Sequence, residues 1–155
     1  MTRARARWSS EAGAELIEFA LVLPLLLLVV LGIIDFGFLF QRYEVVTNAA
    51  REGARIAVLP GYAPSDVVFR VDQYLAAGGL TGAHPAPSIV PSTITVVVGG
   101  VPQCVGLTSV TVTYPHTYSF VGGVAAYFGG TGLASRTALR ATAEMRNELP
   151  ATGCP

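Results

Sequence analysis

The chain has 155 residues, of which 52% are hydrophobic and only 13% are charged. Average soluble domains carry about 25% charged residues, so this composition indicates a membrane segment. The formal net charge is zero, which leaves no basic surface for a phosphate backbone and argues against a nucleic-acid partner. All ten basic residues are Arg, so a phosphate-binding loop built on a Gly-Lys pair is excluded.

A long apolar run lies near the N-terminus. Residues 19–34 contain no charge, Asp35 follows, and residues 36–40 are apolar again. Crossing the hydrocarbon core takes about 20 helical residues, and residues 19–40 reach that length if Asp35 lies near the far interface. The run is apolar on every side, unlike the amphipathic helix of a soluble core. It therefore predicts one membrane-spanning helix.

The flanking charges predict the orientation of this helix. Arg3, Arg5 and Arg7 precede it, and the positive-inside rule then keeps the N-terminus in the cytoplasm and exports the remainder. A cleaved secretory signal is the main competing interpretation. It would end at a small-residue site such as A-x-A, and no such site follows Ile34.

Two residues in the apolar run are unusual. Glu18 lies at its cytoplasmic edge, where it is either an intramembrane carboxylate with a partner and a function or a helix-start acid facing the headgroups. Pro24 removes a helical hydrogen bond and predicts a bend, which a helix that must leave the bilayer and join a bundle could use. Alternatively, Pro24 is simply tolerated, as prolines in membrane helices often are.

The segment Gly13-Ala14-Glu15-Leu16-Ile17-Glu18-Phe19 resembles the cleavage site of type IV prepilins, with Glu18 fifth and Phe19 sixth after Gly13. Residues 13–40 as a whole resemble the TadE-like family of tight-adherence (Tad) pilus assembly proteins. The family's next element is matched by residues 47–55, and two of its strands are similar to residues 110–115 and 141–148.

The resemblance implies a minor pilin or pseudopilin of the bacterial cytoplasmic membrane. A prepilin-type aspartic peptidase would cut between Gly13 and Ala14 on the cytoplasmic side. The protein would then assemble with other pilin or pseudopilin subunits and the Tad assembly platform. In this interpretation Glu18 and Phe19 serve subunit assembly, because Glu18 of one subunit could neutralise the new amine on Ala14 of its neighbour.

The rest of the chain predicts a small α+β head. The first helix is expected to continue to about Val58, with Ala49, Ala50, Gly53, Ala54 and Ala57 forming a small-residue face for either a partner subunit or the protein's own sheet. Residues 78–91 are expected to be a loop. A second helix and the three strands of an antiparallel sheet are expected at residues 65–77, 93–98, 107–114 and 137–147.

The expected domains are a cytoplasmic leader at residues 1–13, a transmembrane and extended helix at 14–59, and an extracytoplasmic pilin-like head at 60–155. Cys104 and Cys154 are the only cysteines, and in an oxidising envelope the pair predicts a disulfide. The disulfide would close a loop of about 50 residues, which stabilises the fold by an amount on the order of 4 kcal/mol. Free thiols are the alternative.

No enzymatic activity, cofactor or metal is expected. A metal site needs more ligands than two distant Cys and two distant His, and neither His84 nor His116 has a nucleophile or carboxylate at a recognisable spacing. Two other hypotheses remain. An uncleaved, single-pass anchored binding module of the envelope would retain residues 1–13, and an anchored hydrolase would need converging acids, a base and a pocket in the head.

Overall fold

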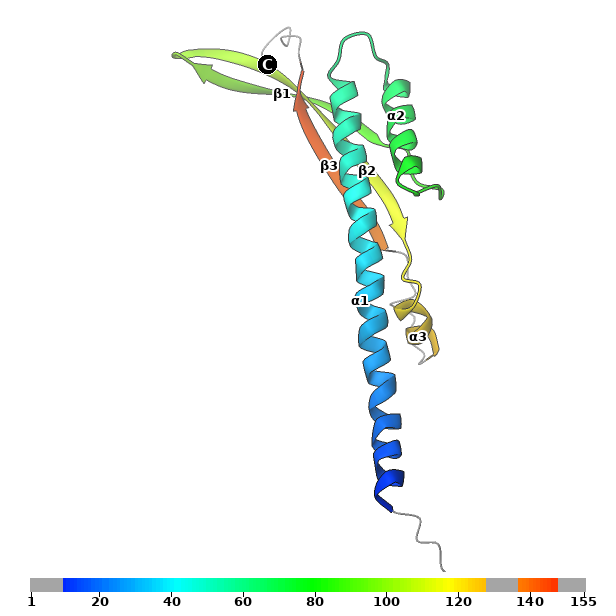
Figure 1. The fold of residues 1–155 in the computed structure, drawn as a ribbon. Coiled ribbons are helices and arrows are strands. Elements are labelled where there is room, and N and C mark those ends of the chain that lie inside the picture. The colour runs from blue at the N-terminus through cyan, green and yellow to red at the C-terminus, as the bar shows by residue number, and fades with distance from the viewer. Residues whose placement is uncertain (1–9, 128–136, 148–155) are drawn as a thin grey trace, which may run out of the picture.

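The structure is a computed structural model that describes residues 10–127 and 137–147. The second half of the first helix packs against the other large elements, and its first half extends away from them (Figure 1). The protein is therefore α+β, with a long N-terminal helix and a small head, as the sequence predicts. Its elements, in chain order, are α1 (Ser10–Ala57), α2 (Pro64–Ala77), β1 (Ser88–Val98), β2 (Val101–His116), α3 (Val121–Tyr127) and β3 (Thr137–Arg146).

Helix α1 has 48 residues, and at 1.5 Å per residue it is about 72 Å long. It is rich in Leu and Ala, which form helices readily. The helix continues through Pro24, so this proline does not end it, and the expected bend stays a prediction. The helix ends at Ala57, close to the expected Val58, because Pro60 cannot continue it and Gly61 turns the chain with a φ of 89°.

Helix α2 begins at Pro64, one residue before the predicted start. Proline suits this position because its missing N–H would have no partner in the first helical turn. The Asp66 carboxylate accepts a hydrogen bond from the Ala63 N–H at 2.8 Å. Val67, Val71 and Leu75, at helical spacing, are buried against the rest of the head.

The three strands form one antiparallel sheet in the order β1-β2-β3, as predicted. Gly99 and Gly100 both have positive φ and make the two-residue turn between β1 and β2. Strand β1 begins at Ser88, so the expected loop at residues 78–91 is wrong at its end. Ser88 pairs with Thr111 and Pro91 with Thr108. Pro91 is tolerated there because β1 is an edge strand.

The core lies where the second half of α1 crosses the sheet and α2. Ala49, Ala50 and Ala54 of α1 are fully buried, so the small-residue face packs on the protein's own head. The sheet contributes alternate residues of β2, and α2 contributes its apolar face. The cluster is completed by Val46, Val67, Val71, Leu75, Leu80, Val110, Val112, Tyr114 and Ala141.

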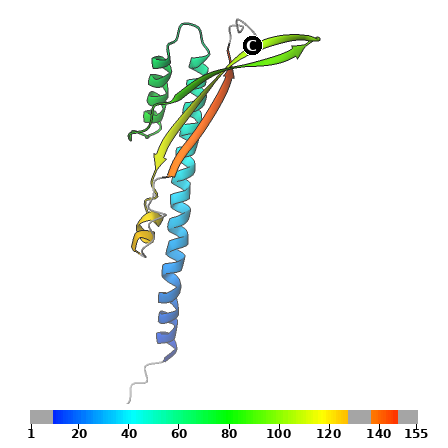
Figure 2. The ribbon, with the colours of Figure 1, turned by 180° about the vertical axis from the view of Figure 1, so that it is seen from behind.

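Two features go beyond the sequence-based expectations. Strand β3 pairs with β2 only over residues 107–116, so the β1–β2 hairpin projects from the head as a two-stranded arm (Figure 2). Val97 on this arm is 67% exposed. Helix α3, which the sequence does not predict, follows β2 and lies beside the first half of α1, below the sheet in Figure 1.

Candidate functional site: the membrane helix and its junction with the head

The first half of α1, residues 13–40, is here called the bare half because the rest of the described chain covers little of it. Large apolar side chains such as Leu21 and Ile33 are 75% and 67% exposed, and Asp35 is the one buried residue between Gly13 and Phe40. Among the described residues, this is the one helix long and apolar enough to cross a membrane. A helix with apolar side chains on all faces and no protein around them requires an apolar environment.

The predicted cleavage site lies at the start of this bare helix. Gly13 is exposed, and a Cβ at this position would meet no atom within 4 Å. Glu18 and Phe19 lie on one face with Glu15 and Val22, where they line a shallow groove. None of the ion pairs within the described residues involves Glu18. The structure thus leaves Gly13, Ala14, Glu18 and Phe19 accessible to other molecules.

Other sequence-predicted positions lie partly outside the described residues. Arg3, Arg5 and Arg7 precede Ser10, where the description begins. Cys104 lies in β2 and pairs with Thr95 of β1, whereas Cys154 lies outside the described residues. The Cys104–Cys154 disulfide therefore stays a prediction.

Asp35 joins α1 to α3, a contact that the sequence reasoning missed. Its carboxylate accepts hydrogen bonds from the backbone N–H groups of Ser119, Phe120 and Val121 at 3.1, 2.9 and 2.7 Å. The N–H groups at a helix start have no partner within the helix, and the helix dipole favours a negative charge there. Asp35 is 2% exposed. The sequence contains one signal for this contact, a single charge inside an apolar run, but it does not identify the partner of that charge.

A second polar contact lies about two turns further along α1, towards the core. His116, at the end of β2, is 2% exposed, and Arg42 of α1 donates a hydrogen bond to its Nδ1 at 3.1 Å. Because Nδ1 accepts, the proton of the neutral ring is on Nε2. This nitrogen is buried and has no hydrogen-bond partner among the described residues. Burial lowers the pKa of His116, the Arg42 cation lowers it further, and the Asp35 carboxylate opposes both effects.

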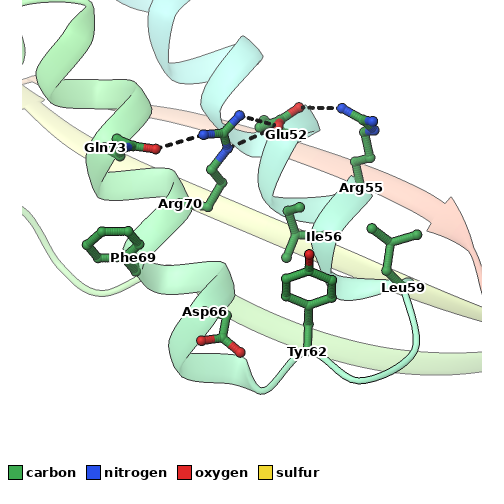
Figure 3. A pocket seen from close by; sticks show the side chains of 9 residues that line it. All are labelled: Glu52, Arg55, Ile56, Leu59, Tyr62, Asp66, Phe69, Arg70 and Gln73. Carbon is green, nitrogen blue, oxygen red and sulfur yellow. Dashed lines mark hydrogen bonds and ion pairs between the residues drawn. The ribbon is translucent and has the colours of Figure 1, made fainter.

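The groove between the end of α1 and α2 encloses about 510 Å³. Two of its lining residues form an ion pair: Arg70 donates two hydrogen bonds to Glu52, from Nε at 3.1 Å and from Nη2 at 2.9 Å (Figure 3). Arg55 approaches the same carboxylate at 3.6 Å, and Arg70 also donates to Gln73 at 2.7 Å. Glu52 therefore ties α2 to α1. Tyr62 and Phe69 also line the groove.

The described part of the chain offers no cluster of three or more His, Cys, Asp or Glu side chains that could hold a metal ion. Its polar groups form connections between elements: Asp35 to α3, Arg42 to His116 and Glu52 to Arg70. These contacts position the head on α1.

Part of the sequence also matches a known protein family. Residues 13–55 match the family model described as TadE-like protein. The matched segment runs from Gly13 through Glu18 and Asp35 to Arg55, and so covers the bare half of α1 and most of the half that packs on the head. The chain matches no curated protein and no solved structure. The family match supports a protein associated with the Tad pilus and confirms the predicted resemblance for residues 13–55.

Proposed function

We propose that the protein is a membrane-anchored minor pilin or pseudopilin that takes part in assembling a Tad-type pilus. One observation carries the proposal: the TadE-like match begins at Gly13 and includes the half of α1 that the other described elements leave mostly uncovered, apart from the contacts around Asp35. Lipid covers such a helix in the bacterial cytoplasmic membrane. Neighbouring apolar helices would cover it in a pilus bundle.

The N-terminus is proposed to face the cytoplasm, where a prepilin-type aspartic peptidase cuts between Gly13 and Ala14. Helix α1 begins at Ser10, so the bond lies within its first turns, which fray readily. Glycine destabilises a helix interior by about 1 kcal/mol relative to alanine, and this helps the backbone to open. Its missing side chain also admits a peptidase closely.

Glu18 is proposed to act after the cut. It lies five residues past Gly13, about 7 Å along the helix at 1.5 Å per residue, and is therefore deeper in the membrane than the new amine on Ala14. A neighbour displaced along the helix axis brings its amine level with this carboxylate. Pairing the two groups removes the cost of two isolated charges in a medium of low dielectric constant.

The test uses a strain that lacks the native gene and expresses single variants. Gly13→Val should accumulate uncut precursor on immunoblots, because a branched side chain blocks the close approach of the peptidase. Glu18→Ala should be cut normally and yet give few surface pili. Glu15→Ala is the matched control, since Glu15 is an exposed acid one turn earlier, and it should support normal pilus numbers.

Two outcomes would contradict these roles. Normal pilus numbers with Glu18→Ala would leave Glu18 as a helix-start acid only. Native protein that retains residues 1–13, by intact mass and N-terminal sequencing, would favour the uncleaved, anchored binding module instead.

Export of the head also implies an oxidising environment for Cys104 and Cys154. Mass mapping without reductant should find these two cysteines linked. Alkylation of both thiols without prior reduction would contradict the disulfide.

A further inference from the structure

Two segments that are far apart in sequence, one with a single charged residue and one with none, meet in this protein. The first is residues 19–41 of α1, in which Asp35 is the only charged residue. The second is residues 117–127, here called the α3 lobe, which belongs to a stretch without any charged residue from Thr117 to Ser135. The hydrogen bonds of Asp35 join the two segments.

The contacts fix the level of the lobe along α1. A Cβ on Gly32 would lie 3.9 Å from Val121 of the lobe, and the Phe36 and Tyr118 rings meet edge to face with centroids 6.4 Å apart. Gly32 precedes the end of the membrane segment, Phe40, by about 12 Å at 1.5 Å per residue. If residues 19–40 span the bilayer, the α3 lobe lies at a depth that lipid occupies.

The exposed surface at this level carries three aromatic rings beside the exposed but uncharged Thr117 and Ser119. Phe36, Phe38 and Phe120 are 54%, 47% and 41% exposed. In water these rings would add to an unusually large apolar patch. At a membrane interface, aromatic side chains are commonly found where acyl chains meet headgroups.

The polar groups at this level satisfy one another. An unpaired carboxylate at membrane depth is costly, and so is each unpaired backbone N–H in lipid. Docking the lobe on Asp35 removes both costs at once, because the carboxylate accepts three N–H groups at the start of α3. The docked lobe can therefore enter lipid, whereas neither part would be stable there alone.

We propose that the α3 lobe lies within the outer leaflet, at the boundary of acyl chains and headgroups, as a foot of the head held on α1 by Asp35. The surface thus fits a lipid interface. This inference rests on the membrane anchoring in the proposed function and does not depend on cleavage or pilus assembly.

The test places single tryptophans in the full chain, reconstituted in phosphatidylcholine–phosphatidylglycerol vesicles. Trp8, the only native tryptophan, is first replaced by Phe. Phe120→Trp then reports on the lobe, Val29→Trp on the middle of the membrane segment, and Val97→Trp on the exposed arm. Quenching by lipids brominated high or low on the acyl chain measures depth, and acrylamide measures contact with water.

Phe120→Trp should emit at shorter wavelength than Val97→Trp and be quenched most by bromines near the headgroups, at an interfacial depth of about 5–10 Å. Val29→Trp should respond most to the deeper bromines. Acrylamide quenching of Phe120→Trp equal to that of Val97→Trp would place the lobe in water and overturn the inference. Protection from both quenchers would also overturn it, by showing that protein such as a second copy covers the lobe.

Two further outcomes are informative. If Val29→Trp is not quenched by bromolipid, the membrane anchor itself is wrong and this inference fails with it. If only Phe120→Trp fails, the proposed anchoring stands. Adding Asp35→Ala to Phe120→Trp should raise acrylamide quenching towards that of Val97→Trp, because the undocked N–H groups return to water. Unchanged lipid quenching in that variant would overturn the role assigned to Asp35.

Discussion

The two halves of α1 have opposite relations between side-chain size and burial. In residues 13–40 the side chains are mostly large and apolar, and most of them are exposed because other described parts of the chain do not cover them. In residues 41–57 the buried residues are mostly small, including Ala49, Ala50, Gly53 and Ala54. Lipid requires only an apolar surface, whereas a sheet and a second helix require close approach of backbones. The most hydrophobic half of the helix therefore adds little to the core of the head.

Asp35 breaks this pattern, since it is the one buried residue of the bare half. Of the changes considered, its removal should destabilise the structure most. Hydrogen bonds to charged groups are worth about 1.5–3 kcal/mol each, and undocked N–H groups recover part of that from water. Asp35→Ala should therefore weaken docking of the α3 lobe by about 3 kcal/mol. Hydrogen exchange should accelerate by about a hundredfold at residues 119–121 and stay unchanged in α2.

Asp35→Asn is the matched control for this prediction. It keeps the size of the side chain and one acceptor oxygen but loses the charge, so its effect should lie between wild type and Asp35→Ala. Equal protection of the lobe in all three proteins would show that the lobe is held by its apolar contacts alone.

Glycines in the two halves offer the sharpest contrast. A Cβ on Gly53 would lie 2.6 Å from Val71 and 3.2 Å from Val110, both of which are fully buried. Alanine gains about 1 kcal/mol over glycine within a helix, but overpacking costs about 1–3 kcal/mol. Gly53→Ala should therefore lower the stability of the head by up to about 2 kcal/mol, measured as a lower melting temperature in detergent micelles.

Gly37→Ala is the matched substitution in the bare half. A Cβ there would meet no atom within 4 Å, so only helix propensity applies and the melting temperature should not fall. If both substitutions lower it equally, the distinction between the two halves is wrong.

The sequence predicts most of this fold because the relevant signals are local. The apolar run predicts the bare helix, and the alternation around Val110 and Val112 predicts β2. The sequence predicts a loop at residues 88–91, because Pro91 and its Gly- and Pro-rich surroundings are typical of one. They form a strand because β2 supplies pairing partners from Thr108 to Thr111, and this information lies elsewhere in the chain.

The candidate site likewise has one part that the local sequence predicts and another that depends on distant residues. Gly13, Glu18 and Phe19 follow from a motif, and their roles stay predictions. Helix α3 could not be predicted, because seven residues that include Gly122 and Gly123 have little helical preference of their own. Its cap comes from Asp35, more than 80 residues earlier in the chain. A charged residue in an apolar run indicated that some partner exists, but only the folded chain identifies it.

The ion pair between α1 and α2 should have a smaller effect than either change above. Arg70 is 45% exposed, and ion pairs near the surface contribute up to about 1 kcal/mol. Glu52→Gln should lower the stability of the head by at most that amount, and the difference should shrink as salt screens the charges. Glu44→Gln, an exposed acid on the same helix, is the control and should change nothing. A loss that is equal at low and high salt would show that charge is not the cause.

The smallest expected effect is a dependence on pH where the packed half of α1 begins. The pKa of His116 is lowered in the folded protein by burial and by Arg42, against the attraction of Asp35. The unfolded state therefore binds its proton at a higher pH, near the ordinary value of about 6.5, and stability falls as the pH drops below that value. Above it the ring is neutral in both states and the stabilising effect is complete.

Melting temperatures at about pH 7.5 and about pH 5, on either side of that ordinary pKa, measure this contribution in wild type and in His116→Gln. Wild type should lose more stability on acidification than His116→Gln, because the variant has no imidazole to protonate beside Arg42. His84→Gln is the control, since the other histidine of the chain lies beside Asp72 of α2, away from the α3 lobe. If wild type and His116→Gln lose equal stability, the Arg42–His116 contact does not favour the neutral ring.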